Sequence, residues 1–381
     1  MNKITKSGIY RREAVELVLQ SFVYALGWSV EIKPCEPHQT EPVKDVPKTK
    51  LNVPATKKKI NTLFGLIILV VLISISVFYI HENDPQVQFE RGISYCEGEG
   101  LERDYAKAVE CFRKSAEQGL ADAQYILGDC YYYGNVVAQD YAEAVKWYRK
   151  AAEQGQADAQ NNLGNCYARG KGVTQDDAEA VKWYRKAATQ GKAGAQYLLG
   201  LCYAGGLGVT KDDAEAVEWY RKAARQGLAE AQFSLGSCYD QGKGVTQDYA
   251  EAVEWYRKAA RQDDADAQFN LGVCYYYGNG VTQDYAEATK LWRKIAEQGD
   301  ADAQFNLGNC YVLGRGVTQD YVEAVNWYGK AAKQGNSDAL CILSLCYANK
   351  DYSKAVNYLR ESAKQGNVEV QKVLDSIKNR R

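Results

Sequence analysis

The chain has 381 residues, of which 46% are hydrophobic and 25% are charged, so most of it can bury a core. Its 47 Lys and Arg balance its 48 Asp and Glu, which argues against a general polyanion binder such as a nucleic-acid-binding protein. Only two histidines are present, which nearly excludes metal sites and general bases built from clustered histidines. We therefore predict no metal and no cofactor.

The N-terminal part, up to Asn61, is basic, with eleven Lys and Arg against six Asp and Glu. Residues 1–33 are predicted to be a short amphipathic helical segment, with the helix over Arg11–Leu26. The sequence leaves open whether this helix lies on a membrane, pairs with a second copy, docks on a partner or folds against its own WSVEI tail. Residues 34–61 contain five of the six prolines and predict an extended, disordered linker.

Residues 62–80 carry no charge, and fourteen of these nineteen residues are Leu, Ile, Val or Phe. As a helix they would be about 28 Å long, close to the roughly 30 Å of a bilayer's hydrocarbon core. A buried core element would need apolar neighbours, but lysines and prolines flank this segment. A cleaved signal peptide fits poorly because a long polar stretch, Met1–Asn61, precedes the apolar run. We predict a single transmembrane helix.

The flanks of this segment predict its orientation. Five lysines lie within the fifteen residues before it, whereas Arg91 is the one basic residue in the fifteen after it. Because basic residues concentrate on the cytoplasmic side, the N-terminus is expected to be cytoplasmic. The C-terminal part is then expected to be extracytoplasmic, in the periplasm or outside the cell.

From Pro85 onward the chain repeats itself every thirty-six residues. Each unit predicts a helix A, a Gly-rich loop, a helix B and a glycine turn, in eight units followed by a capping helix that starts at Glu369–Leu374. A glycine recurs in helix A at Gly128, Gly164, Gly200, Gly236, Gly272 and Gly308. Helix B is predicted to be N-capped by Asp140, Asp176, Asp248, Asp284 and Asp320. One helix pair cannot bury its apolar face, so the pairs are expected to stack.

The repeating blocks A-x-A-Q-x-x-L-G-x-C-Y, G-x-G-V-T-Q-D-Y and E-A-V-x-W-Y-R-K-A-A-x-Q-G occur in register. This pattern resembles the Sel-one-like repeat (SLR) family, a relative of the tetratricopeptide repeats. The resemblance implies an all-α fold over residues 86–381, a right-handed α-solenoid of helix-turn-helix repeats. The transmembrane helix predicted from residues 62–80 would precede it. The resemblance also implies an adaptor or scaffold function, and it supplies no catalytic residues.

Helix A can be numbered from its first alanine, so that Ala121 is position 1. At about 100° per residue, positions 3, 7, 10 and 11 share one face and stay fixed between units, whereas positions 2, 5, 9, 12 and 13 lie opposite and vary. A helices of such stacks line the concave side, so the variable stripe is predicted to line a groove that binds a protein or peptide. The predicted partner-binding residues are Tyr125, Asp129, Tyr132, Tyr133, Asn161, Asn165, Arg169, Tyr197, Phe233, Asp240, Phe269, Tyr276, Tyr277, Phe305 and Asn309.

These side chains are aromatic, amide or charged, which is the composition of interface hot spots. Tyr276 and Tyr277 are expected to contribute to binding without packing in the fold. The alternative is that the aromatic residues of the stripe only pack against neighbouring helices, above all at position 5, which is aromatic in five units.

Seven of the eleven cysteines stand at position 10 of successive units. Stacked helices lie about 8–10 Å apart, whereas a disulfide needs Cα atoms within about 7 Å, so a disulfide ladder is not expected. These thiols are predicted to be buried and unpaired. Two units hold a second cysteine, which gives the pairs Cys96 with Cys111 and Cys341 with Cys346.

The sequence favours a non-enzymatic binding protein. Both histidines precede the repeats, and no nucleophile elbow, phosphate loop or zinc-protease motif occurs. The Gly-x-Gly-Val loop joins two helices in every unit and does not predict a phosphate cradle. Residues 81–381 are net negative, which argues against nucleic acid. The alternative is a cell-envelope enzyme or enzyme regulator that acts on cell-wall or host ligands.

Overall fold

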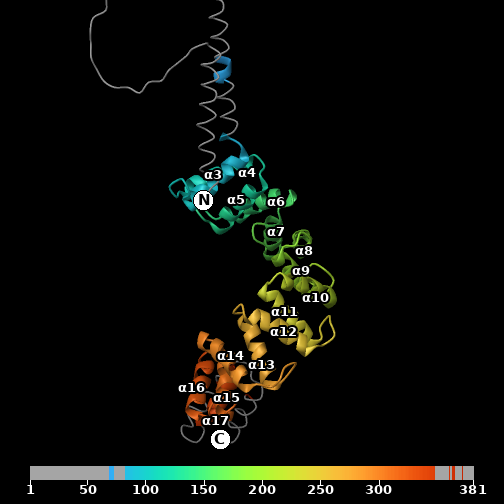
Figure 1. Cartoon of the computed structure of the whole chain (residues 1–381), viewed down its shortest axis with the longest axis vertical. Coiled ribbons are helices and arrows are strands. Elements are labelled where there is room, and N and C mark those ends of the chain that lie inside the picture. Colours follow the sequence, from blue (N-terminus) through green and yellow to red (C-terminus); the bar gives the residue numbers. More distant parts are fainter. Residues whose placement is uncertain (1–67, 73–81, 348–359, 361–362, 365–370, 372–381) are drawn as a thin grey trace, which may run out of the picture. The chain divides into compact units, whose positions relative to one another are not determined.

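A computed structural model describes residues 68–72, 82–347, 360, 363–364 and 371 (Figure 1). Throughout this part the regular structure is helical, without strands, as predicted. The predictions for residues 1–33 and 34–61, and for most of 62–80 and of the C-terminal capping helix, lie outside the described residues. Within the described ranges, no helix combines the length and apolar character needed to cross a bilayer.

The repeats form two alternating series of helices. The A helices are α3 (Pro85–Glu97), α5 (Ala121–Tyr133), α7 (Ala157–Arg169), α9 (Ala193–Gly205), α11 (Ala229–Gln241), α13 (Ala265–Tyr277), α15 (Ala301–Leu313) and α17 (Ser337–Tyr347). The B helices are α4 (Tyr105–Glu117), α6 (Tyr141–Glu153), α8 (Asp177–Thr189), α10 (Asp213–Arg225), α12 (Tyr249–Ala260), α14 (Tyr285–Gln298) and α16 (Tyr321–Lys333). Each helix packs against the one before it and the one after it, so the repeats share a continuous core.

Local residues set the ends of these helices. The carboxylate of Asp176 caps α8 by accepting a hydrogen bond from the backbone N–H of Glu179 at 3.0 Å. The other predicted aspartates cap their B helices in the same way. Gly170 ends α7 with a φ of 64°, a left-handed conformation that glycine adopts without strain. The predicted N-caps of the B helices are therefore confirmed.

The glycine in the middle of each A helix allows a close helix contact. A Cβ added to Gly164 would lie 2.6 Å from the Tyr184 ring of α8 and 3.2 Å from the Ala180 carbonyl oxygen. Next to this glycine, Ala159 and Leu163 are fully buried. The fixed positions of helix A therefore pack the A helix directly onto its own B helix, with a tyrosine ring occupying the space that a side chain would need.

A buried amide ladder connects consecutive repeats. Gln160 Nε2 donates to the Ala152 carbonyl at the end of the preceding B helix at 3.0 Å, and its Oε1 accepts from Gln190 Nε2 at 2.8 Å. The same pair of bonds recurs around Gln124, Gln196, Gln232 and Gln304. The Ala152 carbonyl also accepts from the backbone N–H of Gly155, so the glutamine of the A-x-A-Q motif adds a second hydrogen bond to a helix C-terminal carbonyl and ties it to the next repeat.

The second glycine of each loop explains the Gly-x-Gly pattern. A Cβ on Gly172 would lie 2.2 Å from the carbonyl oxygen of Tyr141, the first residue of the preceding B helix. Gly208, Gly244, Gly280 and Gly316 approach the preceding B helix equally closely. The loop therefore packs against the previous repeat.

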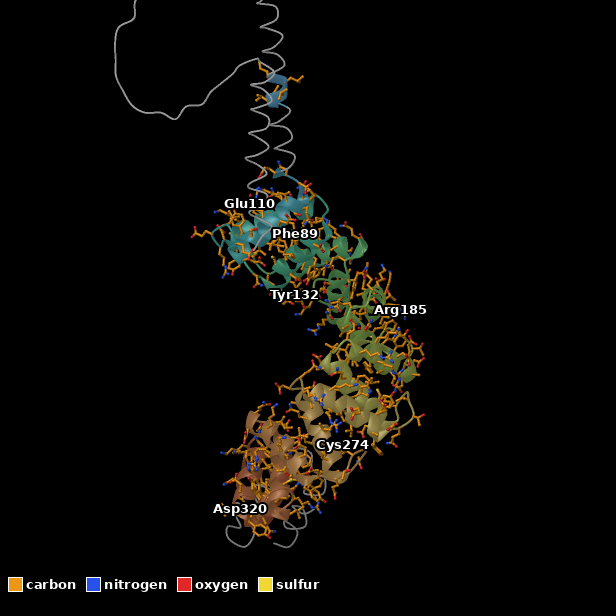
Figure 2. All side chains as sticks on the ribbon, viewed as in Figure 1. Phe89, Glu110, Tyr132, Arg185, Cys274 and Asp320 are labelled. Carbon is orange, nitrogen blue, oxygen red and sulfur yellow. The ribbon has the colours of Figure 1, made fainter. Side chains whose placement is uncertain are left out.

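All ten described cysteines are free. Cys166, Cys202, Cys274 (Figure 2) and Cys310 are buried, and burial raises the pKa of the Cys166 thiol to about 11. The unpaired state predicted at position 10 is confirmed in the described residues. Burial is wrong for Cys346, which is exposed, and incomplete for Cys130 and Cys238.

Candidate functional site

The A-helix stripe, defined as positions 2, 5, 9, 12 and 13 of the A helices, is the predicted binding surface. At position 5 the aromatic rings are half-buried and face an aromatic ring of the unit's own B helix. Tyr125 and Tyr148 have ring centroids 6.3 Å apart, and the pairs Tyr197–Tyr220, Phe233–Tyr256, Phe269–Trp292 and Phe305–Tyr328 are similar. These five residues therefore pack within the fold, as the alternative interpretation expected, and leave part of each ring accessible.

Position 9 interacts with the same B-helix tyrosines. The Tyr184 hydroxyl donates to Asn165 Oδ1 at 2.8 Å, and the Tyr328 hydroxyl donates to Asn309 Oδ1 at 2.7 Å. In the second unit Asp129 takes this place and accepts from the Tyr148 hydroxyl at 2.6 Å. The polar residues at position 9 thus hold the hydroxyl group of the B-helix tyrosine, whose ring packs against the glycine in the middle of helix A.

Asp129 differs from its amide counterparts because it is a half-buried acid. Its Oδ1 also accepts from Asn162 Nδ2 at 3.2 Å. Burial raises the pKa of the Asp129 carboxyl above its ordinary value, although the hydrogen bonds from Tyr148, Tyr125 and Asn162 oppose this shift. The folded chain therefore binds a proton at Asp129 more tightly than the unfolded chain does.

Replacing Asp129 by Asn is expected to stabilise the fold at neutral pH by about 1 kcal/mol, since it removes a desolvated charge and keeps the acceptor for Tyr148. Because the pKa of Asp129 is raised in the folded chain, its protonation stabilises the fold at pH values below the pKa that it has in the unfolded chain. That stabilisation is lost as the pH rises through the pKa of the folded chain. The gain from Asp129→Asn should therefore grow from pH 3 to pH 7 in urea unfolding. Equal gains at both pH values would contradict this account, and Asp122→Asn, at an exposed position, is the control.

Position 12 requires a correction. Tyr276 is only 8% exposed; its ring lies 5.3 Å from that of Trp292, and its hydroxyl accepts a hydrogen bond from Arg315 at 2.6 Å. The expectation that Tyr276 does not pack in the fold is wrong, because Trp292 of α14 and Arg315, in the loop after α15, enclose it. Tyr132 (Figure 2) is half-buried against Tyr148 and Tyr141.

Position 13 supplies the most exposed members of the stripe. Tyr133 is 61% exposed and Tyr277 is 65% exposed. Arg169, at the same position in the third unit, is also exposed. Tyr133 and Tyr277 each contact the preceding tyrosine edge to face, and most of each ring remains open to solvent.

The structure brings part of the predicted site together between the second and third units. A cavity of about 140 Å³ is lined by Tyr132, Tyr133, Tyr148, Asn162, Asn165 and Arg169. Four of these residues were predicted from sequence. Tyr148 and Asn162 were missed, although the W-Y-R-K block, which recurs in α6, α8, α10 and α12, signals Tyr148. Hydroxyl, amide and guanidinium groups beside an exposed ring can hydrogen-bond a peptide backbone and stack on its side chains.

The remaining predicted residues lie elsewhere along the stripe. Phe233 lines a second cavity, of about 160 Å³, with Tyr220, Ser237 and Lys243 among its neighbours. Asp240 accepts a hydrogen bond from the Tyr256 hydroxyl at 3.4 Å, and burial raises the pKa of its carboxyl. Asn161 is half-buried, and its Oδ1 lacks a hydrogen-bond partner in the described part. Among the residues that the structure describes, no group of His, Cys, Asp and Glu side chains is placed to hold a metal ion.

The family model of the Sel1 repeat matches eight segments of this chain in succession. The matched residues are 85–120, 121–156, 157–192, 193–228, 229–264, 265–300, 301–336 and 339–367. The chain belongs to the Sel1 repeat family. The eight repeats predicted from sequence are confirmed, and Sel1 repeat proteins generally mediate protein–protein interactions and are typically non-catalytic scaffolds.

Solved structures support the same assignment. The chain is similar to a protective antigen of uropathogenic Escherichia coli with an SLR fold, at 40% identity and a TM-score of 0.72. The match covers 79% of this chain, which spans 66% of the length of that structure. A Sel1 repeat protein from Oxalobacter formigenes is 36% identical with a TM-score of 0.57, over 63% of this chain and 96% of that one. A comparison with curated proteins gives no match.

Proposed function

We propose that this Sel1 repeat protein is a membrane-anchored scaffold that binds a protein or peptide partner on its A-helix stripe. The observation that carries the proposal is the pair of exposed rings, Tyr133 and Tyr277, on a surface whose other aromatic residues are packed. A tyrosine ring supplies a large contact area with few rotatable bonds, so it binds a partner at low entropic cost. The cavity next to Tyr133 supplies the hydrogen-bonding groups that would orient a peptide.

The stripe can be tested by alanine substitution once a partner has been captured by crosslinking. We expect Tyr133→Ala with Tyr277→Ala to weaken partner binding about thirtyfold, the effect of losing roughly 2 kcal/mol of anchoring energy. Both rings are exposed, so circular dichroism and the unfolding midpoint should not change. The measurement is the dissociation constant for the captured partner by interferometry.

Tyr105→Ala with Tyr321→Ala is the matched control, because these tyrosines are 50% and 62% exposed but begin B helices. Binding that depends on the control pair and not on Tyr133 and Tyr277 would place the partner site outside the stripe.

The membrane anchor and its orientation are also part of the proposal. The uncharged residues 62–80 and the lysines before them support a span with a cytoplasmic N-terminus and extracytoplasmic repeats. The similarity to a protective antigen is compatible with repeats outside the cytoplasm. Protease added to intact cells, with an outer membrane permeabilised if there is one, should digest the repeats and spare the segment Met1–Asn61. Repeats that stay protected until the inner membrane is lysed would refute this orientation.

A further inference from the structure

The A and B helices differ in charge. The six A helices from α5 to α15 hold seven carboxylates and one basic side chain, Arg169. The six B helices from α6 to α16 hold sixteen basic residues and twelve acidic ones. The face that we propose for partner binding is therefore acidic, although the chain as a whole is almost neutral.

Acidic residues in a first helical turn are favoured by the helix dipole, and five of the seven carboxylates lie there. The dipole does not explain why most of these five lack an ion pair among the described residues. Three of the six first-turn glutamates in the B helices from α6 to α16 form ion pairs one turn later, as Glu143 does with Lys146 and Glu179 with Lys182. In the described part, Asp122, Glu230 and Asp266 have no such ion pair and are exposed.

The remaining carboxylates of these helices have partners. Asp158 pairs with Lys192, and Asp302 accepts a hydrogen bond from Asn336 at 2.8 Å. Asp264, which caps α13, lies close enough to Asp266 and Glu230 that both carboxylates add to the effect of burial in raising its pKa. Three carboxylates, those of Glu230, Asp264 and Asp266, thus lie close together at the start of α11 and α13, on the helices that also carry the half-buried rings of Phe233 and Phe269.

The aromatic residues of the stripe already bind cations within the chain. The ammonium group of Lys171 lies 5.1 Å from the centre of the Tyr132 ring and 4.9 Å from that of Tyr141. The guanidinium of Arg315 contacts Tyr276 and Tyr285 in the same arrangement. Tyr133 and Tyr277 adjoin these pairs edge to face, and their own rings are exposed. A cation from a partner can therefore contact them in the same way.

We infer that the partner segment that occupies the A-helix stripe is a basic peptide, in which Lys or Arg side chains meet the unpaired carboxylates and the exposed tyrosine rings. This inference rests on the proposed function and adds the chemical class of the partner. Complementary charge across an interface guides encounter and excludes segments of the wrong sign, so acidic segments would be rejected.

The test uses random dodecapeptides displayed on phage and selected on the immobilised full-length protein. Selected peptides should be enriched in Lys and Arg, and their affinity should fall as salt rises. For the synthetic peptides that bind most tightly, Asp122→Asn, Glu230→Gln and Asp266→Asn combined should weaken binding about tenfold, the sum expected from three exposed ion pairs. Glu117→Gln, Glu153→Gln and Glu297→Gln combined is the matched control, since it removes three exposed carboxylates from B helices.

The following results would contradict the inference that the partner is a basic peptide. If selected peptides are neutral or acidic, or if both triple variants bind them equally well, the partner is not recognised by charge. In that case the scaffold proposal still stands if Tyr133→Ala with Tyr277→Ala weakens binding, and falls with it if that change has no effect. If ultracentrifugation shows a dimer that only the A-helix variant dissolves, the occupant is the basic B-helix surface of a second copy, and the inference is wrong.

Discussion

Gly164→Ala is expected to destabilise the repeats by about 2–3 kcal/mol, because one methyl group does not fit between α7 and α8. The added Cβ would lie 2.6 Å from the Tyr184 ring, and that tyrosine cannot move freely because its hydroxyl is held by Asn165 at 2.8 Å. Alanine is otherwise the better helix former, so a net loss of stability can come only from a steric cost that exceeds the gain in helix propensity. The measurement is the urea midpoint by circular dichroism, with hydrogen exchange to locate the loosened repeat.

Gly329→Ala is expected to stabilise the fold, whereas Gly164→Ala should destabilise it. Gly329 lies inside α16, has an ordinary negative φ, and an added Cβ would have no neighbour within 4 Å. The change should therefore stabilise α16 by roughly 0.5–1 kcal/mol through helix propensity. If both substitutions had the same sign, the close contact with the tyrosine would not be the reason that helix A contains glycine.

Gln160→Leu is expected to destabilise the fold by about 2 kcal/mol, since it removes two hydrogen bonds that each contribute roughly 1 kcal/mol. This loss is expected although leucine is the more apolar side chain in a buried position. The substitution leaves the Ala152 carbonyl without its 3.0 Å donor and removes the acceptor of Gln190. Thermal and urea unfolding should both record the loss, and the amide protons at the end of α6 should exchange faster.

The sixth repeat supplies the control for this ladder. Gln268 donates to the Ala260 carbonyl, but its Oε1 has no hydrogen-bond partner among the described residues. Gln190→Ala should therefore destabilise the fold by about 1 kcal/mol, whereas Gln298→Ala, at the equivalent position of the sixth repeat, should change it by less than about 0.5 kcal/mol. Equal effects would show that the amide-to-amide bond contributes nothing.

The sequence alone determined the number of repeats, the N-caps of the B helices and the unpaired state of the cysteines at position 10. Caps such as Asp176 and turn glycines such as Gly170 act on backbone groups a few residues away, so their effect is visible in the sequence. A period of thirty-six residues that returns the same packing residues predicts a stack, because no single pair can bury its own face. These features do not depend on the contacts that a side chain makes with distant parts of the chain.

Only the tertiary structure decided which residues of the stripe are open to a partner. Helical periodicity gives the faces of one isolated helix, but each A helix also meets its own B helix, the preceding B helix and a neighbouring loop. Tyr276 and Tyr277 are adjacent in sequence, yet Trp292 and Arg315 enclose the first while the second projects into solvent. The exposure of a side chain is set by what lies opposite it, and Trp292 and Arg315 are sixteen and thirty-nine residues away from Tyr276 in the sequence.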